Sequence, residues 1–308
     1  IGSTGSSDCN ICAVGYYSLS GSQKDCSICS VGTYPSKTIT ISSPAADWRG
    51  IASSPDFTRM AATVSNVGIY MSVDSGVSWS LSGAATKVWS GITASPDFTR
   101  MAATVSNGSI YMSVDSGVSW SLSGAATKVW SGITASSDFT RMAATVSNGG
   151  IYMSVDSGVS WSLSGAATRE WSGITASSDF TKMAATVSYG GIYRSVDSGE
   201  NWSVLSGAAT RQWSGITASS DFTKMAATVS NVGIYMSVDS GVSWSLSGAA
   251  TKVWSGITAS PDFTRMAATM NGNGNIYQSS DSGGAWTSNG LITGAVASSG
   301  GATNCTVC

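Results

Sequence analysis

Short apolar stretches separated by turn residues recur along most of this chain. In SIYMSVD (109–115), Ile, Met and Val alternate with Tyr, Ser and Asp, and this period of two predicts a β-strand. WSGITAS (89–95) and MAATVS (101–106) predict two strands before it, and WSLSGA (120–125) predicts one after it. No stretch of this region has a sustained helical period, so the pattern predicts an all-β chain.

This set of four strands returns six times between about Trp48 and about Gly290. Every copy holds a first tryptophan, a DFT[RK]M segment and a box such as SVDSGVSW, and the box aspartates are 41 or 42 residues apart. Repeats of about 40 residues with four short strands are typical of β-propeller blades, so the spacing predicts a six-bladed propeller. The first tryptophans are Trp48, Trp89, Trp130, Trp171, Trp213 and Trp254, and the DFT[RK]M segments begin at Asp56, Asp97, Asp138, Asp179, Asp221 and Asp262.

The box has a physical reason to form a hairpin. Asp and Ser side chains accept backbone N–H groups within a turn, and a glycine two residues after the Asp can take a positive φ. The tryptophan three residues after the glycine returns on the next strand and can lie over the turn. We therefore expect six structural clasps rather than six reactive sites. Their aspartates are Asp74, Asp115, Asp156, Asp197, Asp239 and Asp281, and their tryptophans are Trp79, Trp120, Trp161, Trp202, Trp244 and Trp286.

These boxes resemble the Asp box, or BNR repeat, of sialidase-like β-propellers, and the resemblance covers about four-fifths of the chain. It implies that the boxes lie at the blade periphery, away from an active centre, and serve folding. A sialidase-like active site would need an arginine cluster, a tyrosine with a glutamate partner and an acid aspartate, all differing from blade to blade. Here the cation of DFT[RK] instead repeats at one position, where we expect a surface pair with the Asp of its own turn worth ~0.5 kcal/mol.

Histidine is absent, which excludes Ser-His-Asp and Cys-His triads and histidine metal sites. A glycosidase could use the two glutamates, Glu170 and Glu200, as a carboxylate pair. The alternative is drift on exposed loops, and near-identity of the copies favours it. We predict no enzyme, no cofactor and no bound metal. The residues that break the repeat are Arg49, Arg169, Glu170, Tyr189, Arg194, Glu200 and Arg211.

All six cysteines lie outside the repeats. The four near the start could hold zinc. However, CNICAVGYYSLSGSQKD and CSICSVGTYPSKT share one 17-residue CxxCxxGxY register, which resembles the small Cys-rich modules of ephrin-receptor-like and TNF-receptor-like ectodomains. Such modules depend on disulfides in an oxidising compartment. The simplest pairing in this register is Cys12–Cys26 and Cys29–Cys305, with Cys9 and Cys308 left to modules outside this segment.

The propeller then becomes an insertion in a small disulfide-rich module. We expect Cys-rich modules at 1–37, the propeller at 38–298 and the start of a further module at 299–308. Both ends of the chain look like cuts in a longer protein. One of the strand-like segments 38–42 and 291–298 is expected to complete the ring, because an open last blade would expose an edge.

The sequons, together with the predicted disulfides, favour a secreted protein, and charge argues against a nucleic-acid partner. The net charge is −2 without a basic patch for nucleic acid, and no apolar run approaches the ~20 residues that span a bilayer. Three N-glycosylation sequons begin at Asn107, Asn201 and Asn304. We expect a structural or adhesive glycoprotein segment whose partners are copies of itself or neighbouring modules in a filament. The layout resembles large glycoproteins of protist and algal surface coats and flagellar hairs.

Two alternatives remain open. The first is a secreted carbohydrate-binding or glycoside-hydrolase-like propeller, because Asp-box propellers host both functions. The second is a propeller assembly factor of photosynthetic membranes, which fits poorly with paired CxxC motifs.

The blade order also predicts where charge lies. In up-and-down blades the DFT[RK] turns and the boxes share one face, with two aspartates for each Lys or Arg. The opposite face holds a basic set in which Glu170 is the only acid: Lys87, Lys128, Arg169, Arg211 and Lys252. This distribution favours head-to-tail stacking or a partner of the basic face. We also expect the Ala-rich MAATV strands to lie in the interior, where the blades crowd toward the axis.

Overall fold

The computed structural model describes residues 16–18, 26–28, 46–272 and 274–288. The chain divides into two units, one of residues 41–290 and one of residues 1–40 with 291–308. In the second unit, β1 (Tyr16–Ser18) and β2 (Cys26–Ile28) form a two-stranded antiparallel sheet.

The predicted disulfides Cys12–Cys26 and Cys29–Cys305, and the predicted outside partners of Cys9 and Cys308, stay predictions. Apart from the backbone of Cys26, these cysteines lie outside the described residues.

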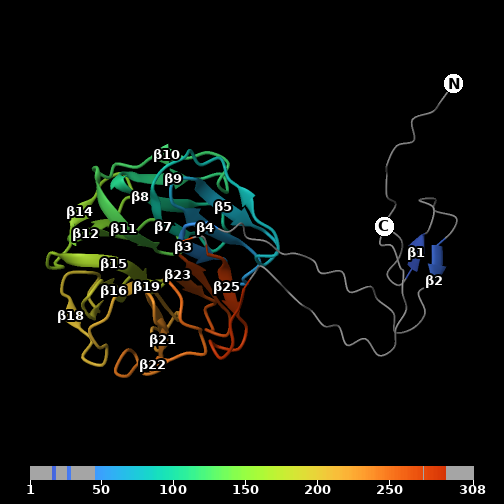
Figure 1. Ribbon diagram of the computed structural model, residues 1–308. Helices are drawn as coiled ribbons and strands as arrows, with labels where there is room; N and C mark the ends of the chain where they lie inside the picture. Colours follow the sequence, from blue (N-terminus) through green and yellow to red (C-terminus); the bar gives the residue numbers. More distant parts are fainter. Residues whose placement is uncertain (1–15, 19–25, 29–45, 273, 289–308) are drawn as a thin grey trace. The chain divides into compact units, whose positions relative to one another are not determined.

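Residues 46–272 and 274–288 contain strands and no helix, which confirms the all-β prediction. Their strands form six successive four-stranded antiparallel sets, which we call sheets 1 to 6 in chain order and which lie around a common centre (Figure 1). The first strands are β3 (Trp48–Ser53), β7 (Trp89–Ala94), β11 (Lys128–Ala135), β15 (Arg169–Ala176), β19 (Trp213–Ala218) and β23 (Trp254–Ala259). The second strands are β4 (Met60–Val64), β8 (Met101–Gly108), β12 (Met142–Gly149), β16 (Met183–Val187), β20 (Met225–Val229) and β24 (Met266–Met270). The third strands are β5 (Gly68–Ser72), β9 (Ile110–Ser113), β13 (Ile151–Ser154), β17 (Ile192–Ser195), β21 (Gly233–Ser237) and β25 (Ile276–Ser279). The fourth strands are β6 (Ser80–Leu81), β10 (Ser121–Leu122), β14 (Ser162–Leu163), β18 (Ser203–Val204), β22 (Ser245–Leu246) and β26 (Thr287–Ser288).

The fourth strands are shorter than the sequence pattern predicts. WSLSGA suggests six residues, but in sheet 2 the strand consists of Ser121 and Leu122, and the N–H of Ser123 adds a last bond to the carbonyl oxygen of Ile110 at 3.0 Å. The strand ends because the N–H of Gly124 turns away and donates to the carbonyl oxygen of Gly158 in the box of sheet 3 at 2.9 Å. The outer edge of each sheet is therefore only two residues long, which limits pairing with foreign strands.

Backbone bridges join each sheet to the next, and the last sheet to the first. They link the residues that precede a first strand to the end of the second strand of the previous sheet, and they merge sheets 2, 3 and 4 into one 12-stranded sheet. The bridges are Ser65↔Val88, Ser106↔Val129, Ser147↔Glu170, Gly190↔Arg211, Ser230↔Val253 and, between sheets 6 and 1, Ala46↔Gly274. Sheets 6 and 1 thus meet with four strands each, and the candidate closing segments 38–42 and 291–298 lie outside the described residues.

The core lies between neighbouring sheets. One cluster joins Ala61 and Ile69 of sheet 1 to Trp89 and Met101 of sheet 2, and similar clusters occupy the other junctions, including that of sheets 6 and 1. All five residues of β4 are buried, as expected for MAATV. Each buried Met or Ile side chain contributes roughly 1.5–3 kcal/mol of transfer free energy before entropy is subtracted. Burial between sheets, rather than within one, ties the stability of each repeat to its neighbours.

The predicted reason for the small residues of MAATV is wrong, because the first strands lie nearest the centre. Residues of the first strands line the central cavity, whereas β4 is the second strand outward. A Cβ on Gly50 would lie 2.9 Å from Cα of Gly91 in the next sheet. The glycine two residues after each first tryptophan therefore allows neighbouring sheets to approach each other closely near the centre of the ring.

Candidate functional site

The six boxes form one repeated hydrogen-bonded turn. In sheet 2, Oδ1 of Asp115 accepts from the Ser119 N–H at 2.9 Å and from Ser113 Oγ at 2.8 Å, while Oδ2 accepts from Ser119 Oγ at 2.5 Å. Ser116 and Gly117 have φ of 59° and 84°, and Nε1 of Trp120 donates to the carbonyl oxygen of Gly117 at 3.2 Å. Both carboxylate oxygens are therefore used inside the turn.

The second acidic series is held in the same way by its own turn. Ser54 Oγ donates to Asp56 at 2.6 Å, and the N–H and hydroxyl of Thr58 donate to the same carboxylate. These hydrogen bonds, that of Ser54 foremost, lower the pKa of Asp56 to about 2. Hydrogen bonds from Ser119 and Ser113 likewise lower the pKa of Asp115 to about 2. Both series remain ionised well below neutral pH.

The cations of DFT[RK] do not pair with the aspartate of their own turn, contrary to the sequence prediction. In the described residues, the ion pair within 4 Å is that of Arg49 with Asp47. The repeated cation reaches the next sheet instead, where Arg59 donates to the carbonyl oxygen of Asp97 at 3.0 Å. Arg141 does the same to Asp179 at 2.7 Å. Four of the six cations therefore link neighbouring sheets through backbone oxygens, and Arg265 lies over the ring of Phe57 in sheet 1.

The two ends of the sheets carry different side chains, as the blade order predicted. Ser75 of the box donates its N–H to Thr58 of the DFT turn, so both turns lie at one end, which we call the box face. The five residues Met60–Val64 separate it from the opposite end, a distance of about 17 Å at 3.3 Å per residue. We call that end the cation face, and its cations are Lys87, Lys128, Arg169, Arg211 and Lys252.

Each of these five cations lies over a tyrosine of its own sheet. Lys87 Nζ lies 4.8 Å from the ring centroid of Tyr111, and the guanidinium of Arg169 lies 4.4 Å from that of Tyr193. The remaining pairs are Lys128 with Tyr152, Arg211 with Tyr235 and Lys252 with Tyr277. In sheet 1 the equivalent position is Ala46. These cation–π contacts restrain Arg169 and Arg211 against a ring, and Arg169 lies in β15 rather than on the exposed loop that the sequence predicted.

A central cavity of about 480 Å³ is lined by the first strands of all six sheets. A belt of hydroxyls surrounds it. Oγ of Ser90 donates to the carbonyl oxygen of Trp130 in the next sheet at 3.0 Å, and Ser131, Ser172, Ser214 and Ser255 make the same bond. From sheet 1 to sheet 2, where Arg49 stands in place of the serine, Thr63 Oγ1 donates to the carbonyl oxygen of Ser90 at 3.0 Å. Thr228 and Thr269 make the same bond to Ser255 and Arg49, beside the serine bonds of their sheets. These hydroxyls are used for structure rather than presented as nucleophiles.

The copies differ in chemistry around the cavity. Arg49 stands where the other five sheets have serine, and Glu170 and Gln212 stand where sheets 2, 3 and 6 have valine. Asn271 stands where the other five sheets have a serine that lines the cavity, which is Ser65, Ser106, Ser147, Ser188 or Ser230. Because Arg49 belongs to sheet 1 and Glu170 to sheet 4, three sheets away in either direction, these two groups lie on opposite sides of the cavity. The cavity mouth is therefore polar and asymmetric.

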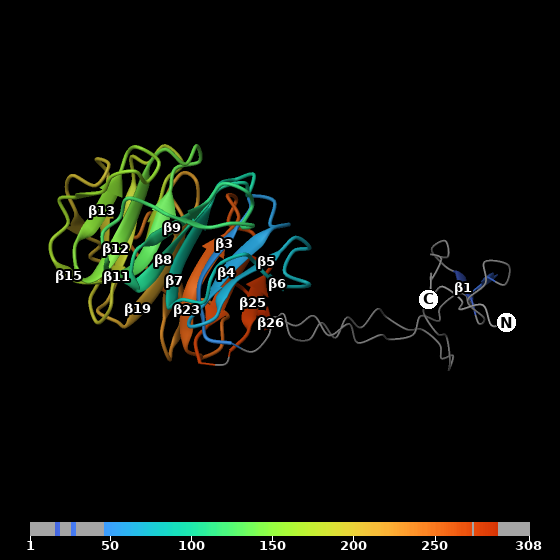
Figure 2. The ribbon, with the colours of Figure 1, turned by 90° about the horizontal axis from the view of Figure 1, so that it is seen from above.

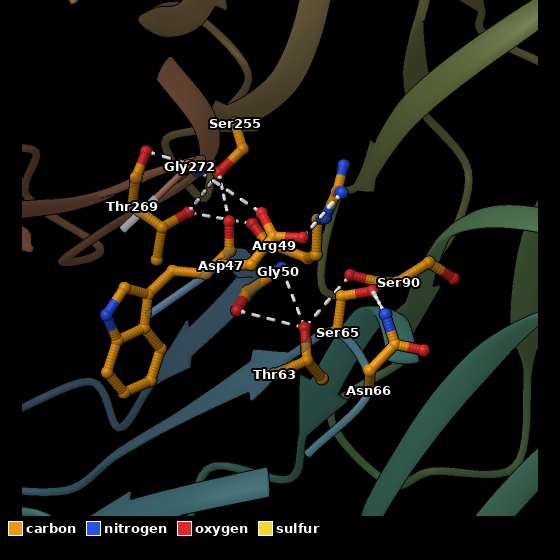
Figure 3. A network of polar contacts seen from close by, with 11 residues as sticks. Asp47, Arg49, Gly50, Thr63, Ser65, Asn66, Ser90, Ser255, Thr269 and Gly272 are labelled. Atoms are coloured by element: carbon orange, nitrogen blue, oxygen red, sulfur yellow. Dashed lines mark hydrogen bonds and ion pairs between the residues drawn. The ribbon is translucent and has the colours of Figure 1, made fainter. Parts of the chain in front are cut away.

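Asp47 anchors this mouth at the junction of sheets 6 and 1 (Figure 3). Its Oδ2 accepts from Nη2 of Arg49 at 2.8 Å, and its Oδ1 accepts from the N–H of Gly272 at 3.3 Å. Asp47, Gln212 and Asn271 were missed by sequence reasoning. Comparing the residues next to the first tryptophans, copy by copy, would have found the first two.

Glu170 and Glu200 do not form a carboxylate pair. Glu170 precedes Trp171 at the cation face, where it pairs with Ser147. Glu200 lies in the box of sheet 4, at the other end of the strands. The intervening length of about 17 Å exceeds the ~5–9.5 Å between glycosidase carboxylates.

Two of the three sequons lie in described residues. Asn107 is exposed at the tip of a turn on the cation face, with φ of 56°. Asn201 belongs to the box of sheet 4, and its Nδ2 donates to Asp197 Oδ2 at 2.7 Å in place of the serine hydroxyl of other boxes. Asn304 lies outside the described residues.

Within the described ranges, no cluster of three or more Cys, Asp or Glu side chains could hold a metal ion. The same ranges contain no helix long and apolar enough to cross a bilayer.

No protein-family model and no curated protein matches the sequence. Solved structures match the fold. The chain is 13% identical to a GH74 xyloglucanase from Xanthomonas campestris, with a TM-score of 0.56 over 82% of this chain and 48% of that one. It is also 13% identical to a GH74 enzyme from Niastella koreensis, with a TM-score of 0.60 over 81% and 46%. The chain thus spans about half the length of these enzymes.

A third similar structure is YCF48 from Cyanidioschyzon merolae, at 17% identity and a TM-score of 0.54 over 81% of this chain and 86% of that one. A YCF48 structure described as bound to D1 peptide is 14% identical. At such identities the likeness concerns the fold alone, and that fold is a β-propeller.

Proposed function

We propose that this chain is a segment of an extracellular structural or adhesive glycoprotein, built on a closed six-bladed propeller of the Asp-box type and flanked by disulfide-rich modules. The observation that carries the proposal is the use of the repeated polar groups. The box aspartates, five of the six DFT[RK] cations and the cavity serines are engaged within or between sheets. Six copies of one four-stranded repeat build the ring, and the polar side chains that recur in every copy stabilise that ring rather than bind a substrate.

Among the described residues, the catalytic groups considered above do not converge on one place, which supports a non-enzyme. The chain has no histidine, and its two glutamates lie at opposite ends of sheet 4. The flanking CxxC register and the sequon at Asn107 support an oxidising, glycosylating route.

Surface labelling tests this proposal. An antibody raised against the 308-residue chain should label intact, unpermeabilised cells of the source organism, and immunogold should place the label on coat or filament structures. Non-reducing peptide mapping of the native protein should recover Cys12–Cys26 and Cys29–Cys305. Label confined to permeabilised cells, or cysteines recovered as free thiols or bound to zinc, would contradict it.

A second candidate, carbohydrate binding, rests on the asymmetric cavity mouth. Arg49, Glu170, Gln212 and Asn271 offer donors and acceptors around 480 Å³, enough for a small polyhydroxyl group. A glycan array followed by calorimetry tests it, with Glu170→Val as the variant that restores the residue of sheets 2, 3 and 6. Binding that is lost in this variant would favour this candidate.

A further inference from the structure

The two ends of the propeller ring carry opposite charge. The box face has twelve aspartates, two for each sheet, against six Lys or Arg residues of the DFT[RK] segments. The cation face has five cations over tyrosines, with Glu170 as the acid beside them and Asp47 paired to Arg49. Each sheet carries two of these aspartates and five of the six sheets carry one of these cations, so charges on both faces recur at the angular spacing of the sheets.

The charges on both faces are held in fixed positions. Cation–π contacts of 4.4–4.9 Å fix the five basic side chains. Turn hydrogen bonds fix the carboxylates, and those same bonds keep the pKa of Asp56 and Asp115 at about 2, so these groups remain charged. A partner that meets either face therefore loses little side-chain entropy on contact.

Both faces also expose apolar side chains. On the box face, one valine in each of five boxes is 60–75% exposed: Val73, Val114, Val155, Val196 and Val238. On the cation face, Val67, Val88 and Val129 are 39–43% exposed, and Tyr189 is 67% exposed. A mixture of fixed charge and apolar surface is suited to a protein partner that offers both.

We propose that the cation face of one copy binds the box face of the next, so that rings stack head to tail along their common axis. This inference rests on the structural role proposed above and names its contact surface. A head-to-tail contact uses two different surfaces, so it leaves one of each free at the ends and continues as a filament unless rotation closes it. A second copy is favoured over an anionic polymer because it matches both the charge and the repeat spacing. A polymer would match the cation face alone.

Sedimentation velocity of the 308-residue chain tests the stacking. At 20 mM NaCl, the sedimentation coefficient should rise with protein concentration, and at 500 mM NaCl the association constant should fall by at least about tenfold through screening. SDS gels without reductant separate this association from disulfide linkage. Wild-type protein that remains a single species at 20 mM NaCl up to millimolar concentration would overturn the proposal.

Two charge-matched variants locate the surface. The first carries Lys87→Gln, Lys128→Gln, Arg169→Gln, Arg211→Gln and Lys252→Gln, and it should not associate. The second carries Arg59→Gln, Arg100→Gln, Arg141→Gln, Lys182→Gln and Lys224→Gln, with the same change in net charge but on the box face, and it should associate as well as wild type or better. Loss of association in both variants, or in neither, contradicts face-to-face contact.

Binding of heparin, a polyanion, tests whether the partner of the cation face is an anionic polymer rather than a second copy of the chain. If wild-type protein does not associate but binds heparin, and the first variant does not, the cation face serves a polyanion and the stacking proposal fails. Surface labelling of native cells is independent of this outcome. A labelled filament without stacking would leave the proposed function intact, whereas stacking by an intracellular protein would contradict only the function.

Discussion

Oγ of Ser255 donates a 2.8 Å hydrogen bond to the carbonyl oxygen of Trp48, which lies 207 residues earlier in the chain. Ser172 makes the equivalent bond to Trp213, one repeat later, at 2.9 Å. The contact that joins the last sheet to the first is thus of the same kind as the contacts inside the ring. Sheet 1 therefore follows sheet 6 in the ring in the same way as sheet 5 follows sheet 4.

Removing this hydroxyl measures how firmly the ring closes. We expect Ser255→Ala to lower the free energy of unfolding by about 1 kcal/mol, the usual net value of one such hydrogen bond. Ser172→Ala is the matched control within the ring and should cost about the same. Urea denaturation followed by tryptophan fluorescence measures both. An effect of Ser172→Ala without any effect of Ser255→Ala would show that sheets 6 and 1 separate before unfolding.

The buried threonines of the second strands should tolerate loss of the hydroxyl less well. Thr228 is fully buried, and its Oγ1 accepts from the N–H of Gly215 at 2.7 Å and donates to the carbonyl oxygen of Ser255 at 2.9 Å. Thr228→Val keeps the shape but leaves the Gly215 N–H without this acceptor, at a cost of about 1–3 kcal/mol. Thr228→Ser keeps the hydroxyl and is the control for the lost methyl group. If the valine variant is as stable as wild type, the N–H has found another acceptor.

Stability should be flat at neutral pH and fall in acid. The pKa of Asp115 is about 2 in the folded chain, against an ordinary value of 3.8. Because folding lowers this pKa, its contribution is complete above about pH 5 and disappears as the pH falls from about 4 to about 2. The same holds for Asp56, Asp97 and other members of both series. Without histidine, no such change is expected between pH 5 and pH 8.

Thermal melting from pH 2 to pH 8, followed by near-ultraviolet circular dichroism, measures this profile. Asp115→Asn should lower the melting temperature by a few degrees at pH 7 and make the profile slightly less steep in acid. A steep loss already between pH 7 and pH 5 would mean that other groups control acid unfolding.

Glycan attachment should distinguish the two described sequons. Asn107 is exposed at a turn tip, whereas the amide nitrogen of Asn201 lies 2.7 Å from Asp197 inside a clasp. We expect glycopeptide mass spectrometry of secreted protein from a eukaryotic host to show high occupancy at Asn107 and lower occupancy at Asn201. Asn201→Ser restores the residue of SVDSGVSW and should leave the melting temperature unchanged. The reverse occupancy would contradict this expectation.

The sequence predicted what depends on neighbours in the chain. The strands, the turns after Ala94 and Ser113, and the positive φ of Gly117 follow from local chemistry repeated six times. What it could not supply are contacts that depend on which sheet lies alongside. Arg59 was expected to pair with Asp56, but the closer acceptor belongs to residue Asp97 of the next sheet.

The radial order of the strands was likewise not visible in the sequence. Ala-rich MAATV and the glycine of WSGITA both indicate close packing, and only the assembled ring shows that the glycine lies against its equivalents near the axis. Figure 2 shows this ring turned by 90° from the view of Figure 1. The position of Arg49 across from Glu170 was accessible, since it follows from six sheets in a ring and a comparison of the copies. It was missed because deviations from the repeat were interpreted as drift.

The near-identity of the copies has a consequence for how this chain reaches its native state. A newly made sheet 2 can dock on sheet 4 or sheet 5 almost as well as on sheet 3, so the search passes through misordered pairings that local energy barely distinguishes. What identifies the true first and last neighbours are the few residues that only they carry. Asp47 accepts from Gly272, and Gln278 of sheet 6 donates to the carbonyl oxygen of Ser75 in sheet 1 at 2.9 Å. If these residues were replaced by those of the other copies, the native ring would keep its packing, but the chain would no longer distinguish the correct first and last sheets from other pairings.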